Sequence, residues 1–459
     1  MPAARLFPWI VPPIWAVVLL LPYGNSVGGW SAWLLILGSW PLFRLRFWPL
    51  WFLFFLPWHV GSLSYFLYSG ALPGSSDLFL FFTHPEDVAE SLDVFLPHLH
   101  KSLLHGFLLF IPVLWLSRRF PAPIWKLRSK ILIGIWLVAA LWFAPPLSAL
   151  KAFVQSWNIA EQGGKPIQLR RIHGEIQAVL SERILLIIGE SMRFDRRLHP
   201  DVLSVYAGGT NTDVSIPLLL NGFREPASWY PDWRENLFIL AKGRHYHTAF
   251  ISAQSEGNLR YIRPFLGEGS LDELVTTERS ELSPHYDGIL LEKIEPILEK
   301  KRFFAVLQMV GSHSPYNFFP QDFDPMIDTL RYPTAVAQNY EKSFLFSKNI
   351  LESLLEKIRR DAPDTWVVFT SDHGEMTGAY LGHNRFEEEV YRVPFFSVGL
   401  PSELVGNIKS HDDIYRLLVG ALGYPRPRQE MLKIHGSMQN GEDGYLGPNP
   451  SGKLERRWY

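Results

Sequence analysis

Long apolar runs fill the first third of this chain and end near residue 150. We predict five membrane-crossing helices, at about 8–23, 30–43, 47–68, 101–117 and 131–149, given the ~20 residues that a helix needs to cross the hydrocarbon. Pro12 and Pro13 are compatible with the first of these, because spanning helices tolerate proline better than soluble helices do. A buried helical core is the alternative, and the long uncharged stretches rich in tryptophan and proline disfavour it. Residues 1–150 are therefore expected to form a transmembrane domain.

The basic residues of this first third predict its orientation. If the chain crosses five times from an inner N-terminus, every basic cluster falls on the inner side: Arg5, Arg44, Arg46, Arg118, Arg119, Lys126, Arg128 and Lys130. Lys and Arg concentrate in cytoplasmic loops, so this arrangement is the favoured one. The fifth span then delivers everything after about residue 150 to the outside. A cleaved signal peptide is not expected, because further hydrophobic segments follow the first.

The composition changes after residue 150. An amphipathic linker is expected over 151–181, followed by five apolar, β-rich runs at Ile184–Ile188, Thr248–Ile251, Phe303–Val310, Trp366–Thr370 and Pro394–Val398. Helix-like stretches such as 286–300 and 338–359 separate them. This alternation predicts an α/β domain over 182–438 with a mostly parallel central sheet. The polar, Gly-rich residues 439–459 are expected to form a loose tail. The net charge of −1 gives no reason to expect a nucleic-acid partner.

Asp372 and His373 directly follow the predicted strand that ends at Thr370. Active sites of open α/β sheets lie at the carboxyl edge of the strands, so this carboxylate and imidazole are expected there. Together they suit Zn²⁺. The chain has no cysteine, so thiolate ligands are excluded. An Asp-His-Gly turn that merely caps the strand is the alternative.

Other polar segments should reach the same edge of the sheet. Glu190 ends the first predicted strand, His313 follows the strand that ends at Val310, and His383 lies shortly after the Asp372–His373 pair. Thr210 and Thr212 lie in a Gly-rich turn that is expected to start a helix. A threonine there can be an N-cap, or it can be a nucleophile, since the free N–H groups of a helix N-terminus favour bound phosphate. Several such residues at one edge are unlikely to be structural by coincidence.

These motifs resemble those of the phosphoethanolamine transferases, membrane enzymes of the alkaline phosphatase and sulfatase superfamily, over nearly the whole chain. The family's Gly-Glu-(Thr/Ser)-x-Arg motif implies a zinc-binding role for Glu190, and its Ser-Asp-His-Gly-Glu motif implies the same for Asp372 and His373. The second threonine of its Gly-Thr-x-Thr-x-x-Ser-(Val/Ile)-Pro motif implies that Thr212 is the nucleophile and also contacts the metal. His313 and His383 match histidines that contact the phosphoryl group or a second metal ion.

The resemblance implies a zinc-dependent, two-step transfer of phosphoethanolamine. The donor would be phosphatidylethanolamine, and the acceptor a sugar hydroxyl of an envelope glycolipid or glycan such as the lipid A or core of lipopolysaccharide. The protein would lie in the bacterial inner membrane with its catalytic domain in the periplasm. The chain cannot form the disulfides that the family's soluble domains often carry, and it departs from the family in two further ways. The spacing from Glu190 to Thr212 is short, which leaves Thr210 as an alternative nucleophile, and a lysine common in close relatives has no counterpart in residues 252–258.

Other functions on the same scaffold are kept as alternatives. Glycerol-phosphate transferases share five spans and a threonine nucleophile, and phosphodiesterases share the soluble fold. Sulfatases need a Cys or Ser within a Cys/Ser-x-Pro-x-Arg motif, which is not found near the site. A non-catalytic scaffold that only retains the fold is the remaining class, and a site without stoichiometric zinc would identify it.

Overall fold

The computed structural model describes residues 60–61, 63–69, 92–119, 175–222, 236–259, 262–277, 286–429, 431–437 and 444–458. The chain divides into two compact units, which we describe separately. In the first unit the main described element is helix α6 (Leu92–Arg119). The Tyr68 ring packs against Phe95 and His98 of this helix, with ring centroids 6.0 and 6.1 Å away.

The predicted membrane spans fall mostly on residues outside those described. Only the predicted span 101–117 lies entirely within a described helix, α6. The spans at 8–23, 30–43 and 131–149 lie outside the described residues, as does most of 47–68 and of the linker 151–181. Among the helices that the structure describes, none is both long and apolar enough to cross a membrane. The transmembrane bundle therefore stays a prediction.

A seven-stranded sheet forms the centre of the second unit, in the order β2-β9-β6-β1-β5-β3-β4. Its strands are β1 (Arg183–Gly189), β2 (Leu203–Tyr206), β3 (His247–Ser252), β4 (Glu273–Val275), β5 (Phe303–Gln308), β6 (Trp366–Ser371) and β9 (Arg392–Val398). The run from β6 through β4 is parallel, and β9 is antiparallel to both its neighbours. The predicted α/β class with a mostly parallel sheet is confirmed.

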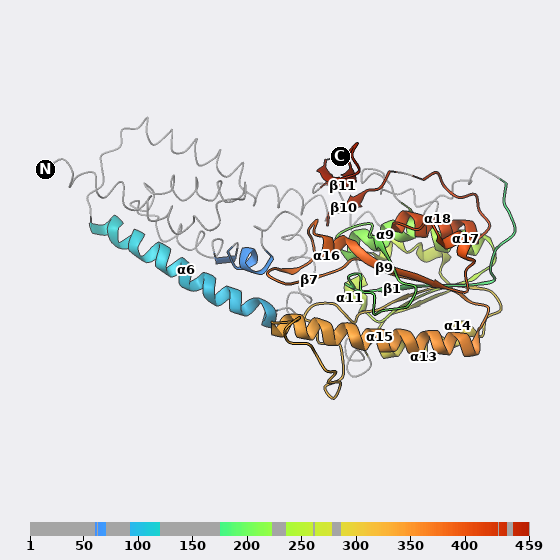
Figure 1. Ribbon diagram of the computed structural model, residues 1–459, viewed down its shortest axis with the longest axis horizontal. Coiled ribbons are helices and arrows are strands. Elements are labelled where there is room, and N and C mark those ends of the chain that lie inside the picture. The colour runs from blue at the N-terminus through green and yellow to red at the C-terminus, as the bar shows by residue number, and fades with distance from the viewer. Residues whose placement is uncertain are drawn as a thin grey trace. The chain divides into compact units, whose positions relative to one another are not determined.

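Helices cover both faces of this sheet (Figure 1). The buried side chains of β1 alternate between two apolar clusters, because successive residues of a strand point to opposite faces. Ile184, Leu186 and Ile188 pack toward α9 (Thr212–Asn221), α10 (Leu237–Gly243) and α18 (His411–Ala421). Leu185 and Ile187 pack toward α13 (Ile289–Lys293) and α15 (Ala335–Asp361). From Ile184 to Ile188 the β1 strand is thus apolar, as expected of a central parallel strand.

Two predicted helices differ in how continuous they are. The stretch predicted at 338–359 lies within the single helix α15. The stretch predicted at 286–300 is broken into η6 (Tyr286–Gly288), α13 and α14 (Glu295–Leu298). Pro296 contributes to the break, because proline has no backbone N–H and is favoured in the first turn of a helix.

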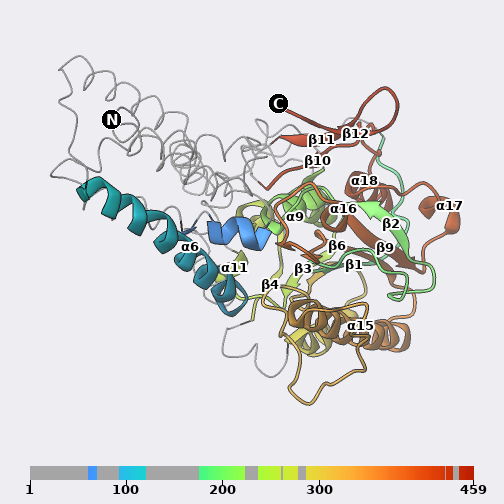
Figure 2. The ribbon, with the colours of Figure 1, turned by 60° about the vertical axis from the view of Figure 1, so that its left-hand side comes forward.

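The C-terminal residues form a second, three-stranded antiparallel sheet where we expect a loose tail. It consists of β10 (Ile434–His435), β11 (Tyr445–Pro448) and β12 (Leu454–Arg457). Figure 2 shows these strands beside α9, and the backbone N–H of His435 donates to the Gly208 carbonyl at 2.9 Å. The short elements are α11 (Glu256–Leu259), η4 (Arg263–Phe265), η5 (Glu268–Ser270), β7 (Met376–Thr377), β8 (Leu381–Gly382), α16 (Glu388–Tyr391) and α17 (Ser402–Val405).

Candidate metal centre and active site

The adjacent strands β1 and β6 deliver three acidic or imidazole side chains to one edge of the sheet. Glu190 directly follows β1, and Asp372 and His373 directly follow β6. The Ser371 hydroxyl fixes the two strand ends together, since it donates to the Gly189 carbonyl at 3.0 Å and accepts from the Met192 N–H at 2.9 Å. All three side chains are buried. Parallel pairing of β1 and β6 therefore brings together residues far apart in the sequence.

The side chains of Glu190, Asp372 and His373 converge closely enough to hold one metal ion. One ligand atom from each lies within 4.8 Å of the other two. The His373 Nε2 atom is 3.3 Å from Asp372 Oδ2 and 3.8 Å from Glu190 Oε1. Two carboxylates and an imidazole form a donor set that suits Zn²⁺ and other divalent ions.

His373 is held in the form that a metal ligand requires. Its Nδ1 lies 2.9 Å from the Gly374 carbonyl, so Nδ1 carries the hydrogen and Nε2 presents its lone pair to the carboxylates. Burial lowers the pKa of His373 to about 4, which keeps the ring neutral near pH 7. Gly374 is needed in this turn, because a Cβ there would lie 2.0 Å from the Glu389 carbonyl oxygen.

Glu190 and Asp372 form a buried pair of like charges. Burial, and then the charge of Asp372, raises the pKa of Glu190 well above its usual range. The Gln254 side-chain amide donates to Glu190 Oε2 at 2.6 Å, and the Ser191 N–H donates to Asp372 Oδ1 at 3.0 Å. Neutral donors orient these carboxylates without cancelling their charge, so a cation between them would fit the site.

Thr212 places its hydroxyl directly on this group. It is the first residue of α9, and its Oγ1 donates to Asp372 Oδ2 at 2.7 Å and lies 3.3 Å from His373 Nε2. The helix is capped by Asn211, whose side chain accepts from the Val214 N–H at 3.2 Å. The N-cap alternative for Thr212 is therefore wrong. The Thr210 hydroxyl instead pairs with Ser437 at 2.9 Å.

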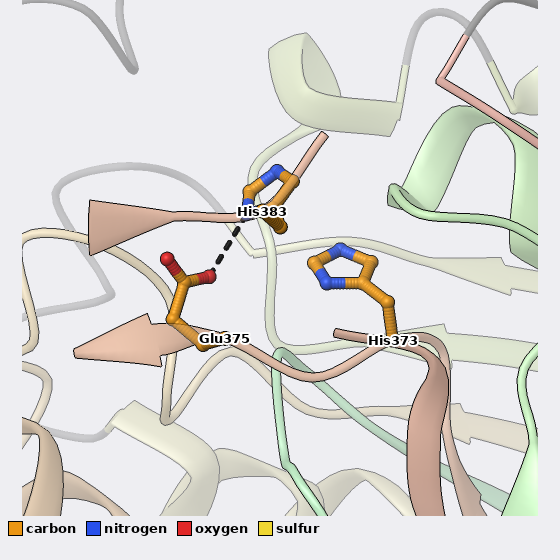
Figure 3. Close-up of side chains that lie close together, drawn as sticks. All are labelled: His373, Glu375 and His383. Atoms are coloured by element: carbon orange, nitrogen blue, oxygen red, sulfur yellow. Dashed lines mark hydrogen bonds and ion pairs between the residues drawn. The ribbon is translucent and has the colours of Figure 1, made fainter. Parts of the chain in front are cut away.

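His383 lies beside His373, with its orientation set by a buried carboxylate. The two imidazole centroids are 4.2 Å apart, and Figure 3 shows Glu375 and His383 pointing toward each other. The His383 Nδ1 lies 2.8 Å from Glu375 Oε2, and the Tyr316 hydroxyl donates to Glu375 Oε1 at 2.8 Å. His373, Glu375 and His383 make a second group that could hold a metal ion. Interaction with His383 holds the pKa of Glu375 below its ordinary value, even though burial opposes this.

His313 is not joined to the candidate metal-ligand group, Glu190, Asp372 and His373, by any contact among the described residues. Its Nδ1 lies 2.6 Å from the Ser314 carbonyl, and its ring contacts Phe318 edge-on at 6.3 Å. The loop that carries it starts at the carboxyl end of β5, on the same edge of the sheet as Glu190 and Asp372. The connection to the site runs through Tyr316, which binds Glu375.

Several residues that support the site were not predicted from the sequence. Gln254, Glu375 and the buried His411 are examples. The Gly208 N–H donates to His411 Nδ1 at 3.1 Å, so His411 Nε2 carries the hydrogen toward the Thr370 hydroxyl, 3.2 Å away. His411 thus links the strand before Asp372 to the turn before Thr212. Of these three residues, only Glu375 could have been identified from the sequence, because it lies inside the motif Ser371–Glu375.

Comparison with known proteins identifies the fold and the domain. Residues 202–424 match the sulfatase family. The lipooligosaccharide phosphoethanolamine transferase A (EptA) of Neisseria meningitidis, an integral membrane protein, has the same fold. That match has a TM-score of 0.58 and 17% identity, and it covers 92% of this chain and 95% of EptA.

Two curated relatives match part of the chain. One is a low-salt glycan biosynthesis sulfotransferase, Agl7, of Haloferax volcanii, 26% identical over 53% of this chain. The other, from Haemophilus influenzae, is named as a candidate phosphoethanolamine transferase and is 24% identical over 43% of this chain. The matched parts span 61% and 42% of these relatives' own lengths. Residues 202–424 therefore form a domain similar to the enzymes of the sulfatase family, and the resemblance of this chain to the phosphoethanolamine transferases is confirmed.

Proposed function

We propose that this protein transfers phosphoethanolamine from phosphatidylethanolamine to a sugar hydroxyl of an envelope glycolipid or glycan, with Thr212 as the nucleophile. One observation carries the proposal. The Thr212 hydroxyl lies 2.7 Å from Asp372 Oδ2 and 3.3 Å from His373 Nε2, at the first residue of a helix. A hydroxyl in a set of metal ligands, beside the free N–H groups of a helix N-terminus, is arranged to attack a phosphoryl group.

The reaction has two displacement steps. In the first, the Thr212 oxygen forms a bond to phosphorus, the bond from phosphorus to the diacylglycerol oxygen breaks, and the threonine proton ends on diacylglycerol. In the second, an acceptor hydroxyl oxygen forms the new bond to phosphorus and the bond to Thr212 breaks. The proton of the acceptor hydroxyl returns to Thr212. The phosphorus atom occupies the same position in both steps, so the same residues contact it in both.

Glu190, Asp372 and His373 would hold a zinc ion in this proposal, with the Thr212 oxygen as a further ligand. When bound, such an ion lowers the pKa of a hydroxyl and offsets negative charge on the phosphoryl oxygens. The protein's own residues position the Thr212 hydroxyl and the Glu190 carboxylate. Asp372 orients the Thr212 hydroxyl, and Gln254 orients Glu190. His383, held by Glu375, and His313 would contact the phosphoryl group or a second ion. The similarity to a phosphoethanolamine transferase supports this choice of chemistry.

The same similarity supports a location in the bacterial inner membrane. EptA is named as an integral membrane protein, and the predicted spans and basic clusters put the catalytic domain on the outer side of the bacterial inner membrane, in the periplasm. The chain has no cysteine, so one introduced at exposed Lys453 can be labelled selectively. A membrane-impermeant maleimide should label Lys453→Cys in cells whose outer membrane has been permeabilised. Labelling only after the inner membrane is broken would contradict this location.

The covalent intermediate tests the proposed function directly. Purified full-length protein is incubated with phosphatidylethanolamine, quenched in acid and digested, and the peptide that contains Thr212 is analysed by mass spectrometry. Phosphoethanolamine on Thr212 is expected in the wild type and in Thr210→Ala, and its absence is expected in Thr212→Ala. A phosphoethanolamine group on another residue, or transfer that persists in Thr212→Ala, would refute the assignment.

The same measurement separates the rival donors. Phosphatidylglycerol would leave glycerol phosphate on Thr212 if the chain is a glycerol-phosphate transferase. Sulfuryl transfer is a second candidate, because one relative is named as a glycan sulfotransferase. In that case a sulfated donor, and no phospholipid, would modify the protein. Release of free phosphoethanolamine without any acceptor product would indicate a phosphodiesterase.

A further inference from the structure

Phe386, Arg456 and Trp458 form a stack on the surface of the catalytic unit. The Arg456 guanidinium carbon lies 4.4 Å from the Trp458 ring centroid and 5.3 Å from that of Phe386. Arg456 is exposed, and Trp458 is 64% exposed. Stacking holds the guanidinium in place, which reduces the entropy lost when it binds a ligand. We refer to these three side chains as the cation stack.

The cation stack is tied from two directions to the turn that carries Thr212. Strand β10 is joined to this turn by the His435 N–H, which donates to the Gly208 carbonyl at 2.9 Å, and by the Ser437–Thr210 hydroxyl pair. Strand β12, which carries Arg456, pairs with β10 through β11. The Asn384 N–H, two residues before Phe386, donates to the Thr210 carbonyl at 3.1 Å.

Asn384 supplies a second, independent sign that a ligand binds here. Its Oδ1 is buried and has no hydrogen-bond partner among the residues that the structure describes. Its φ of 57° lies in the left-handed region, which is unusual for a residue other than glycine. Buried acceptors are normally satisfied, and strained backbone is concentrated at functional sites. A hydroxyl donor from a ligand would satisfy this oxygen.

The charge of the cation stack distinguishes between the two substrates. The donor head group ends in an ammonium ion, which Arg456 would repel. An acceptor sugar that carries phosphate or carboxylate would be attracted, and guanidinium suits both anions. The exposed indole of Trp458 offers a flat apolar surface to the C–H face of a sugar ring.

We propose that the cation stack and Asn384 form the acceptor subsite, which takes a sugar ring bearing an anionic group. This inference rests on the proposed function. Trp458 packs against the ring, Arg456 pairs with the anion, and Asn384 Oδ1 accepts from a sugar hydroxyl. The acceptor then lies beside the turn that carries the modified Thr212, where its attacking hydroxyl can reach phosphorus.

The test measures discharge of the threonine intermediate. Full-length protein is loaded with labelled phosphatidylethanolamine and then chased with envelope glycolipids extracted from cells that lack this protein. A second portion of the glycolipids is first treated with phosphatase. For each variant the readout is the rate of acceptor-dependent discharge divided by the rate of threonine loading, both at low acceptor concentration. Melting temperature is recorded in parallel.

Arg456→Gln should lower this ratio about tenfold for the untreated glycolipids, about 1.4 kcal/mol, and much less for the dephosphorylated ones. Trp458→Ala should lower it for both, and Trp458→Phe should recover most of the loss. Lys453→Ala removes a positive charge from the turn just before β12, outside the cation stack, and is the matched control.

Three results would overturn this proposal. Ratios equal to the wild type in both Arg456→Gln and Trp458→Ala would do so. So would a loss of threonine loading that matches the loss of discharge, because that pattern marks a purely structural role. Wild-type protein that loads but is discharged by neither glycolipid fraction would also contradict it. Failure of the wild type to load threonine at all would instead refute the proposed function.

Discussion

Two buried acidic regions at the carboxyl edge of the sheet differ in how their charge is compensated. Glu190 and Asp372 face each other and His373 Nε2, so three lone-pair donors converge within 4.8 Å. Asp287 is alone. Its Oδ1 accepts from the Val310 N–H at 2.6 Å, and its Oδ2 accepts from the Ser347 hydroxyl at 2.7 Å. Each region has a fully buried carboxyl group with a raised pKa, Glu190 in the first and Asp287 in the second.

This difference separates a candidate metal-binding group from a structural carboxylate. Both Asp287 oxygens accept hydrogen bonds, one from the segment after β5 and one from α15. These hydrogen bonds fix the start of the loop that carries His313. The neighbouring Gly311 has no room for a side chain, since a Cβ would lie 1.6 Å from Ser347 Oγ. The Glu190 and Asp372 oxygens face one another, and two charged carboxylates in this arrangement are costly unless a proton or a metal cation lies between them. Buried acidity alone therefore does not mark a site, whereas convergence of acceptor atoms does.

Removing the Thr212 hydroxyl should have the largest effect. Thr212→Ala should lower phosphoethanolamine transfer by about 10⁴-fold, because covalent catalysis is lost while the ligand group remains. The melting temperature should stay within a few degrees of the wild type. Transfer is measured by mass spectrometry of glycolipids. Thr210→Ala is the control, and an equal loss in both variants would assign the effect to the turn rather than to the nucleophile.

Metal removal should destabilise the group formed by Glu190, Asp372 and His373, and it should leave the surroundings of Asp287 unchanged. Chelation should abolish transfer and lower the free energy of unfolding by about 4 kcal/mol if the ion is present at a thousand times its dissociation constant. Added Zn²⁺ should restore both in the wild type. Glu190→Gln should retain little metal, which elemental analysis would detect. Full activity after exhaustive dialysis against chelator would contradict a metal centre.

The free energy of unfolding should depend on pH because of Asp287, and replacing Asp287 should remove that dependence. Burial raises the pKa of this carboxyl to about 6, so the folded protein binds a proton that the unfolded chain has released. Stability from this group is therefore full below about pH 4 and falls by about 3 kcal/mol as the pH rises through 6. In Asp287→Asn that decline should be absent.

Denaturant unfolding at several pH values checks this expectation. Ser347→Ala is the matched variant, because it removes a donor and leaves the carboxyl, so the pH-dependent decline should be retained or increased. Parallel curves for the wild type and Asp287→Asn would mean that Asp287 is not the titrating group.

Replacing Gln254 should have the smallest effect of these changes, and the effect should be on metal affinity. Its amide only orients Glu190, so Gln254→Ala should weaken metal affinity by about tenfold, the usual consequence of losing a group that orients a ligand. Competition with a zinc-binding dye measures the affinity. Gln254→Glu should weaken it further, because a third carboxylate beside Glu190 adds repulsion when it is charged. Unchanged affinity in both variants would show that Glu190 is held without Gln254.

Local sequence patterns were sufficient to predict the main strands and the longest helix of the catalytic unit. The five apolar, β-rich runs form β1, β3, β5, β6 and β9, and the helical pattern of 338–359 lies within α15. The short edge strands β2 and β4 were missed, because a few residues carry little periodic signal. The direction of β9 was also not predicted, since pairing direction depends on which strand lies next to it.

The amino-acid sequence by itself determined the fold class and the residues available for chemistry. Side chains next to strand ends had to meet at one edge of a parallel sheet, so Glu190, Asp372 and His373 could be named in advance. Only the tertiary structure decided between Thr212 and Thr210 as the residue on that group, because both occupy the same turn. It also supplied Gln254 and Asp287, whose hydrogen-bond partners are distant in the sequence. Such contacts depend on how the elements pack, and no local pattern records them.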